Sequence, residues 1–215
     1  MTQIIPTVLD TTEEKYKVDI DKVLSVPELA NNWVQIDLMD NKFVQNLSIG
    51  LDVIAKYHIF AKTEAHMMVS EPKRWFKELK NLGFKRVLFP IEVGDTQSCI
   101  KEARKMGFEV GLTINPPTNL HLVLEFIDKI DVVLVMGVVP GFQGQPFSEN
   151  TYQRVRKIAG YKSRYNFLIE VDGGINPENA RKLVDNGADI LAVGSKLFNG
   201  YITKNFEKFK IALSR

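Results

Sequence analysis

Two aspartates and a histidine are the residues in this chain best suited to chemistry. Asp37 lies in the middle of one apolar segment, Asp172 ends another, and His66 lies near the end of a third. A carboxylate in such a segment loses hydration, so it needs a partner, a metal ion or a reaction that offsets this cost. A single aspartate of this kind could cap a loop or pair with a lysine, whereas two of them with a histidine favour a functional site. Glu170 shares the face of Asp172 in the same extended segment, and we assign it no catalytic role.

Three glycine-rich segments form a second group of candidates. They are Val139-Pro-Gly-Phe-Gln-Gly-Gln145, Asp172-Gly-Gly174 and Gly194-Ser195. Glycine leaves backbone N–H groups uncovered, and barrel enzymes often hold a phosphate with the loops that follow their last strands. One Gly-Gly or Gly-Ser pair predicts only a turn. Three glycine-rich segments after three consecutive apolar segments favour a phosphate site.

Methionines lie beside the same candidates. Methionine usually fills gaps in a core, but Met39, Met68 and Met136 each lie at the end of an apolar segment. We therefore expect them to form apolar walls around a reacting centre. The other two histidines, His58 and His121, lie at the end and at the start of helical stretches, and we expect no function for either.

The elements that must position these residues alternate regularly along the chain. Eight segments rich in Val, Ile, Leu and Phe are predicted strands: 4–9, 33–38, 60–66, 84–89, 108–114, 132–136, 167–171 and 190–193. Charged stretches with helical spacing separate them, and in one of these, 72–81, the residues Trp75, Phe76 and Leu79 fall on one face. Near-continuous apolar strands that alternate with helices are typical of a parallel sheet covered on both faces.

Glycines recur at the junctions between helical stretches and strands, and their spacing predicts the architecture. Gly83, Gly107 and Gly187 each stand between a helical stretch and the next strand, where glycine supplies the left-handed residue that ends a helix. Eight units of roughly 25 residues favour an α/β protein with a (β/α)8 TIM barrel, with an open doubly wound sheet as the alternative. No linker or low-complexity tract divides the chain, so we predict one barrel domain over residues 1–215.

Composition excludes several classes of function. The formal net charge of +2 gives no strong basic field for nucleic acid, and no apolar segment is long enough to cross a membrane. The single Cys99 cannot form an internal disulfide, and the first ten residues do not resemble a signal peptide. We therefore expect a cytoplasmic protein that binds neither nucleic acid nor membranes.

Taken together, the motifs resemble those of the ribulose-phosphate 3-epimerases. The resemblance runs in order along nearly the whole chain and rests on Asp37-Leu-Met-Asp40, Phe43-Val-Gln-Asn46, His66-Met-Met-Val69, Val139-Pro-Gly-Phe-Gln-Gly-Gln145, Ile169-Glu-Val-Asp-Gly-Gly-Ile175 and Val193-Gly-Ser195. It implies a (β/α)8 barrel of the ribulose-phosphate-binding type. It also implies a ketose phosphate as substrate, with inversion of the carbon beside the ketone, and a homo-oligomer.

The resemblance assigns roles to individual residues. It implies that Asp37 and Asp172 exchange a proton with the substrate through an enediolate, and that both bind a divalent metal with His66. Zinc is the first expectation for the metal, with iron, manganese or cobalt as alternatives. The remaining residues that match substrate- or phosphate-binding positions are Thr7, Met39, His66, Met68, Met136, Gly141, Phe142, Gln143, Gly144, Gly173, Gly174, Gly194 and Ser195.

The chain departs from the family pattern on the same face. Gln35 replaces a histidine ligand of the metal, and Pro90 replaces a histidine after the fourth strand. Asn41 stands where the family has glycine, and Asp10 replaces a small polar residue. Gln35 could bind the metal through its amide oxygen or aim its NH2 group at the substrate, and we expect weaker metal binding than with histidine.

Three functions remain open from the sequence. The first is a ribulose-phosphate 3-epimerase, or a relative that acts on a hexulose phosphate. The second is a barrel that binds sugar phosphates without turnover, because Gln35 and Pro90 replace active-site residues. The third is an aldol-type or decarboxylating enzyme that uses the same aspartate. The presence of both aspartates required for two-sided proton transfer argues against this third function.

Overall fold

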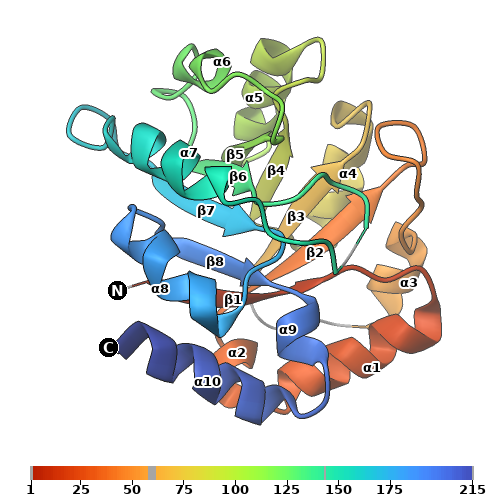
Figure 1. Cartoon of the computed structure of the whole chain (residues 1–215). Helices are drawn as coiled ribbons and strands as arrows, with labels where there is room; N and C mark the ends of the chain where they lie inside the picture. Colours follow the sequence, from red (N-terminus) through yellow and green to blue (C-terminus); the bar gives the residue numbers. More distant parts are fainter. Residues whose placement is uncertain (1, 58–61, 143, 215) are drawn as a thin grey trace.

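Eight parallel strands form a closed barrel in the computed structural model, which describes residues 2–57, 62–142 and 144–214 (Figure 1). The strands are β1 (Gln3–Val8), β2 (Trp33–Met39), β3 (Lys62–Met68), β4 (Arg86–Pro90), β5 (Glu109–Ile114), β6 (Val132–Met136), β7 (Leu168–Asp172) and β8 (Ile190–Val193). Each strand pairs with the next, and β1 pairs with β8 through Ile4 and Leu191. This closure confirms the predicted (β/α)8 barrel and rules out the open sheet.

Helices surround the barrel and connect successive strands (Figure 1). They are α1 (Glu13–Leu24), α2 (Pro27–Ala30), α3 (Leu51–Lys56), α4 (Lys73–Asn81), α5 (Thr96–Lys105), α6 (His121–Leu124), α7 (Asn150–Ala159), α8 (Pro177–Asp185), α9 (Ser195–Phe198) and α10 (Ile202–Ser214). Within the described residues, no helix is both long enough and apolar enough to cross a membrane.

The predicted strands are confirmed, with shifts at several ends. The segments 132–136 and 190–193 match β6 and β8, whereas β4, β5 and β7 begin after Phe84, Phe108 and Phe167. These three phenylalanines are buried where the chain approaches each strand, so the apolar pattern extends beyond the ladder. Leu9 lies just beyond the end of β1. Residues 60 and 61 of the predicted third strand lie outside the described residues.

The helix signals are also confirmed. In α4, Phe76 and Leu79 are buried and Trp75 packs against the same core, as the helical spacing predicted. Gly83 and Gly107 follow α4 and α5 with φ of +85° and +77°, a left-handed backbone that favours glycine. These two turns lead the chain from α4 into β4 and from α5 into β5.

The interior of the barrel contains a buried ionic cluster that we did not predict. Arg86 begins β4, and its guanidinium Nη1 lies 2.7 Å from Oε2 of the buried Glu64, while Nη2 lies 2.7 Å from Oε2 of Glu109, whose side chain is 47% exposed. The Arg86 guanidinium also lies 4.0 Å from the centroid of the Trp33 ring. Glu170 is fully buried beside Glu64, and its burial and the charge of Glu64 raise the pKa of Glu170 well above its usual range.

Candidate active site

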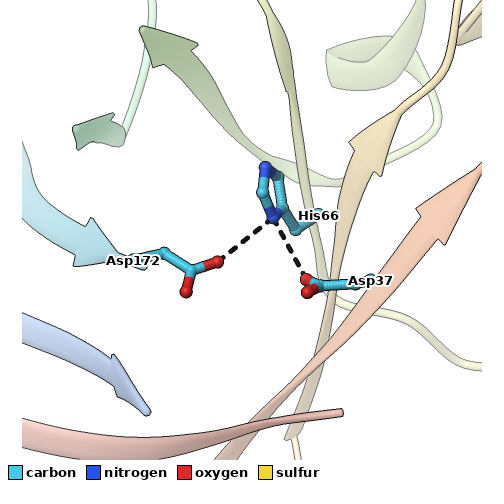
Figure 2. Close-up of side chains that lie close together, drawn as sticks. All are labelled: Asp37, His66 and Asp172. Atoms are coloured by element: carbon cyan, nitrogen blue, oxygen red, sulfur yellow. Dashed lines mark hydrogen bonds and ion pairs between the residues drawn. The ribbon is translucent and has the colours of Figure 1, made fainter. Parts of the chain in front are cut away.

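Asp37, His66 and Asp172 meet at the carboxyl ends of three strands (Figure 2). Asp37 in β2 is the register partner of His66 in β3, and Asp172 ends β7 on the other side of the barrel mouth. His66 Nδ1 lies 3.1 Å from Asp37 Oδ1 and 3.3 Å from Asp172 Oδ2. All three residues are buried. The barrel therefore brings together the three residues that stood out in the sequence.

Two further side chains hold this group in place. Gln35, two residues before Asp37, donates from Nε2 to Asp37 Oδ1 at 2.9 Å, to Asp172 Oδ2 at 2.8 Å and to Thr7 Oγ1 at 2.7 Å. Thr7 in β1 donates its hydroxyl to Asp37 Oδ1 at 3.2 Å. Gln35 Oε1 and His66 Nε2 are buried and have no partner among the described residues.

Burial and neighbouring charges have opposing effects on the pKa values of His66 and Asp37. Burial alone lowers the pKa of His66, but the hydrogen bonds and charges of Asp172 and Asp37 outweigh it and raise the pKa to about 10. Burial raises the pKa of Asp37, although His66 and Gln35 stabilise its charged form. Together, these effects favour a protonated His66 and an Asp37 whose proton affinity is above that of an exposed aspartate.

The three residues fit a divalent metal ion. Their ligand atoms, two carboxylate oxygens and one imidazole nitrogen, lie within 4.8 Å of one another. Two carboxylates and a histidine are within the ligand range of catalytic zinc and also suit iron or manganese. His66 Nδ1 faces both carboxylates, as Figure 2 shows, so no change of backbone is needed for the three groups to share one ion.

A pocket opens above this group, and most of the predicted binding residues line it. The lining includes Thr7, Asp37, His66, Met68, Met136, Gly141, Phe142, Gly144, Asp172, Gly173, Gly174, Gly194 and Ser195. Met39 does not line the pocket; it is buried against Met68 and Val44, because its side chain packs under the loop after β2. Gln143 lies outside the described residues.

The glycines after β7 are required by close packing. Gly173 and Gly174 have φ of +100° and +70°. A Cβ at Gly174 would lie 2.9 Å from the Cα of Phe147, which is closer than real Cβ contacts allow. Asn179 in α8 donates from Nδ2 to the carbonyl of Gly174 at 3.0 Å. The backbone of this loop is therefore fixed against the pocket.

The loops after β2 and β6 contact each other. Asn46, after β2, donates from Nδ2 to the carbonyl of Gly141, after β6, at 2.9 Å. Gln145 donates from Nε2 to the carbonyls of Val139 and Phe142 at 2.6 and 3.0 Å. Phe142 is 58% exposed. These contacts fold the loop after β6 over the edge of the pocket.

Several lining residues were missed by the sequence analysis. They are Leu9, Val138, Pro140, Gln145, Ile175 and Ala192. Leu9, Val138, Ile175 and Ala192 are apolar side chains at or near strand ends, where the sequence pattern does not separate a pocket wall from a core. Pro140 and Gln145 lay within the predicted glycine-rich segment, which is the signal that could have identified them.

The structure also shows the backbone or contacts of the other positions that depart from the family pattern. Asn41 has φ of +54°, the left-handed conformation that glycine adopts readily and asparagine tolerates. Asp10 pairs with Lys15 beyond β1, and Pro90 ends β4. His121 begins α6 and is exposed, whereas His58 lies outside the described residues.

Comparisons with known proteins agree with this geometry. The sequence matches the ribulose-phosphate 3 epimerase family over residues 3–198. The ribulose-phosphate 3-epimerase of Schizosaccharomyces pombe is 31% identical over 204 residues, which cover 92% of this chain and 87% of that protein. The ribulose-phosphate 3-epimerase of Buchnera aphidicola subsp. Baizongia pistaciae is 32% identical over 187 residues, which cover 83% and 82%.

Solved structures of proteins with other names contain the same barrel. The 3-hexulose-6-phosphate synthase of Salmonella typhimurium has a TM-score of 0.71 and covers 99% of both chains, and its 16% identity shows a likeness of fold alone. The sequence comparisons are more specific. Because the family match spans residues 3–198 and two relatives are 31% and 32% identical over most of the chain, this chain belongs to the ribulose-phosphate 3-epimerase family.

Proposed function

We propose that this epimerase interconverts ribulose 5-phosphate and xylulose 5-phosphate, with Asp37 and Asp172 as the groups that move the proton at C3. The observation that carries the proposal is the meeting of these two carboxylates, from β2 and β7, in one pocket lined with glycine-rich loops. Membership in the family supports the sugar-phosphate substrate. The assignment places the protein in pentose phosphate and carbohydrate metabolism.

Inversion at C3 requires a proton to leave one face of the carbon and to return on the other. One aspartate removes the proton beside the ketone, an enediolate forms, and the other aspartate donates a proton to the opposite face. Burial supports this role because it raises the pKa of Asp37, and a carboxylate with raised proton affinity is a better base near neutral pH. Thr7 orients Asp37 through its hydroxyl.

Negative charge on the enediolate oxygens must be stabilised, because a positioned carboxylate alone accelerates proton transfer by about 10² to 10⁴. A divalent metal held by Asp37, His66 and Asp172 would supply this stabilisation when bound, with zinc first and iron, manganese or cobalt as alternatives. Met68 and Met136 line the pocket and would exclude water from the reacting carbon.

The substrate phosphate would lie at the glycine-rich side of the pocket. Gly173, Gly174, Gly194 and Ser195 line this side, and glycine peptides offer N–H groups without an obstructing side chain. Gly141, Phe142 and Gly144 belong to the loop after β6 and line the pocket, where they would cover the substrate. We include Gln143 in this group on its sequence position alone.

Comparison of substrates tests the proposal. The purified protein would be assayed with ribulose 5-phosphate and with a hexulose 6-phosphate, and kcat/KM would be compared. We expect xylulose 5-phosphate as product and a higher kcat/KM for the pentulose phosphate. A product with fewer or more carbons would instead identify an aldol-type or decarboxylating enzyme. Binding of both substrates without turnover would identify a sugar-phosphate-binding barrel.

Two further proposals concern the protein in the cell. We propose a cytoplasmic location, which the single Cys99, buried and unable to pair within the chain, supports. We also propose a homo-oligomer, which rests on the resemblance to the family. Analytical ultracentrifugation of the purified chain would test the second proposal, and a sedimenting mass of 24.4 kDa would contradict it.

A further inference from the structure

Gln35 contacts both carboxylates of the candidate active site without lining its pocket. Gln35 is fully buried in β2. Its Nε2 lies 2.9 Å from Asp37 Oδ1 and 2.8 Å from Asp172 Oδ2. The same two oxygens lie 3.1 and 3.3 Å from His66 Nδ1. The amide therefore holds the two carboxylate oxygens that, with His66, form the candidate metal-binding group.

The contacts of Gln35 determine which end of the amide faces the carboxylates. Three acceptors surround Nε2, because Thr7 Oγ1 also lies 2.7 Å away. The Thr7 hydroxyl donates its own hydrogen to Asp37, so its oxygen is free to accept from Gln35. An amide oxygen at this position would instead face two carboxylates. The NH2 group therefore faces the two aspartates, and Gln35 Oε1 is buried with no hydrogen-bond partner in the part of the chain that the structure describes.

We propose that Gln35 is a positioning residue whose NH2 group clamps the two catalytic carboxylates together and thereby competes with the metal ion for them. The inference rests on the proposed roles of Asp37 and Asp172. A metal ion that takes Asp37 Oδ1 and Asp172 Oδ2 as ligands must displace the two hydrogen bonds from Gln35. Hydrogen bonds to charged acceptors are about twice as strong as neutral ones, so this displacement lowers metal affinity.

A competing Gln35 and a metal-ligating Gln35 have opposite effects on metal affinity. If Gln35 competes, removal of its NH2 group strengthens metal binding; if Gln35 binds the metal through Oε1, removal weakens it. Methionine has nearly the length and shape of glutamine but can neither donate a hydrogen bond nor offer an amide oxygen. The variant Gln35→Met therefore separates the two roles.

The experiment is a titration of the metal-free full chain with Zn²⁺, and separately with Co²⁺, by isothermal calorimetry without substrate. We expect Gln35→Met to bind both ions about tenfold more tightly than the unchanged protein. Thr113→Val is the matched control, because Thr113 is a buried threonine of β5 whose hydroxyl has no partner among the described residues. We expect this control to leave metal affinity unchanged and Asp172→Asn to abolish binding.

A second measurement uses the unchanged protein and so does not depend on the fold of a variant. In ¹⁵N-edited NMR spectra, the side-chain NH2 signals of Gln35 should lie far from those of exposed glutamines and should move when Zn²⁺ saturates the site. Weaker or equal metal binding by Gln35→Met, or an unmoved NH2 signal at saturation, would overturn the inference. Turnover is measured separately, so loss of the epimerase assignment would be recognised by absent activity in a protein that still binds metal.

Discussion

At the scale of single residues, one carboxylate oxygen organises the candidate active site. Asp37 Oδ1 accepts from Thr7, Gln35 and His66, and two of these donors also reach Asp172. The donors hold the two carboxylates in fixed orientations, while burial keeps Asp37 from becoming a weak base. Proton transfer on two faces of a substrate depends on this fixed geometry.

The first prediction concerns the two aspartates. Asp37→Asn and Asp172→Asn keep the side-chain shape but remove the proton-accepting group, so each should lower kcat for epimerisation by at least about 100-fold. Steady-state assays with ribulose 5-phosphate measure the effect. Asp128→Asn, at an exposed position, serves as the control and should retain full activity. Normal turnover by either active-site variant would refute the proposed roles.

The second prediction concerns pH. His66 has its pKa raised from 6.5 to about 10 in the metal-free protein, whereas a metal ligand must be neutral. Metal binding should therefore release close to one proton between pH 7 and 9, and Zn²⁺ affinity should rise about tenfold per pH unit. Calorimetry in buffers of different ionisation enthalpy counts the proton. Affinity that does not change with pH would show that His66 is neutral before the metal binds.

The same shift sets the sign of a stability effect. Because the folded pKa of His66 lies above its unfolded value, the protonated side chain stabilises the metal-free fold. This contribution is fully present below about pH 6.5 and is lost as pH rises through 10. Urea unfolding of the metal-free protein should therefore show the contribution of His66 falling over that range, and His66→Asn should remove this part of the pH dependence.

The active-site residues could be predicted because their types were unusual for their places. Asp37 and Asp172 lie in apolar segments, and both proved to share one pocket with His66. The orientation of Gln35 could not be predicted, because an amide presents a donor and an acceptor and only its neighbours decide which is used. The packing of Met39 against Met68 and Val44, outside the pocket lining, could not be predicted, since a strand end alone does not say whether a side chain faces the pocket or packs beneath a loop.

At the scale of the elements, tight turns bring the backbone to the pocket. Gly174 follows β7 and packs against the backbone of Phe147, while Asn179 of α8 holds its carbonyl. The capping box between Asn176 and Asn179 begins α8 directly after this turn. The loop, the helix start and the pocket wall are thus one hydrogen-bonded unit. The sequence predicted the glycines, but the contact with Phe147 depends on the path of the loop after β6.

The third prediction concerns this unit. Gly174→Ala places a Cβ 2.9 Å from the Cα of Phe147 in a backbone of φ +70°, so it should destabilise the fold by about 2 kcal/mol or more and raise KM for the sugar phosphate. Urea unfolding and steady-state kinetics measure the two effects. Gly94→Ala is the control, because no atom lies within 4 Å of the added Cβ there. Equal stability of the two variants would show that the loop moves freely.

Element boundaries were predictable only in part. The apolar pattern identified all eight strands, but Phe84, Phe108 and Phe167 precede their strands while remaining buried. A residue in a helix-to-strand connection can pack against the core without joining the ladder, and hydropathy does not distinguish the two. The glycines at the helix ends were more reliable, because a left-handed backbone restricts the choice of residue.

At the scale of the whole molecule, the barrel interior combines apolar layers with a buried ionic cluster. Leu88, Val132 and Leu134 pack together inside the barrel, while Arg86 bridges Glu64 and Glu109. The cluster lies on β3, β4 and β5, so it ties neighbouring strands. The sequence predicted closure from the repeat of strand and helix. The cluster was missed because Glu64, Arg86 and Glu109 lie on three strands, and only the strand register makes them neighbours.

The fourth prediction concerns this cluster. Arg86→Met leaves the buried Glu64 without its cation and should lower the free energy of unfolding by about 3 to 5 kcal/mol. Arg104→Met removes a comparable ion pair with Asp131 at a partly exposed position and should cost about 1 kcal/mol or less. Urea unfolding at pH 7 compares them. If both variants lost the same stability, the buried cluster would not support the barrel.

Proton NMR of ribulose 5-phosphate in D2O, with the purified protein and added Zn²⁺, distinguishes proton transfer by Asp37 and Asp172 from binding without chemistry. The two-aspartate account predicts that deuterium enters C3 as xylulose 5-phosphate forms, and that both changes vanish in Asp37→Asn and Asp172→Asn. Epimerisation that continues in either variant, or ribulose 5-phosphate that binds without exchange at C3, would contradict it.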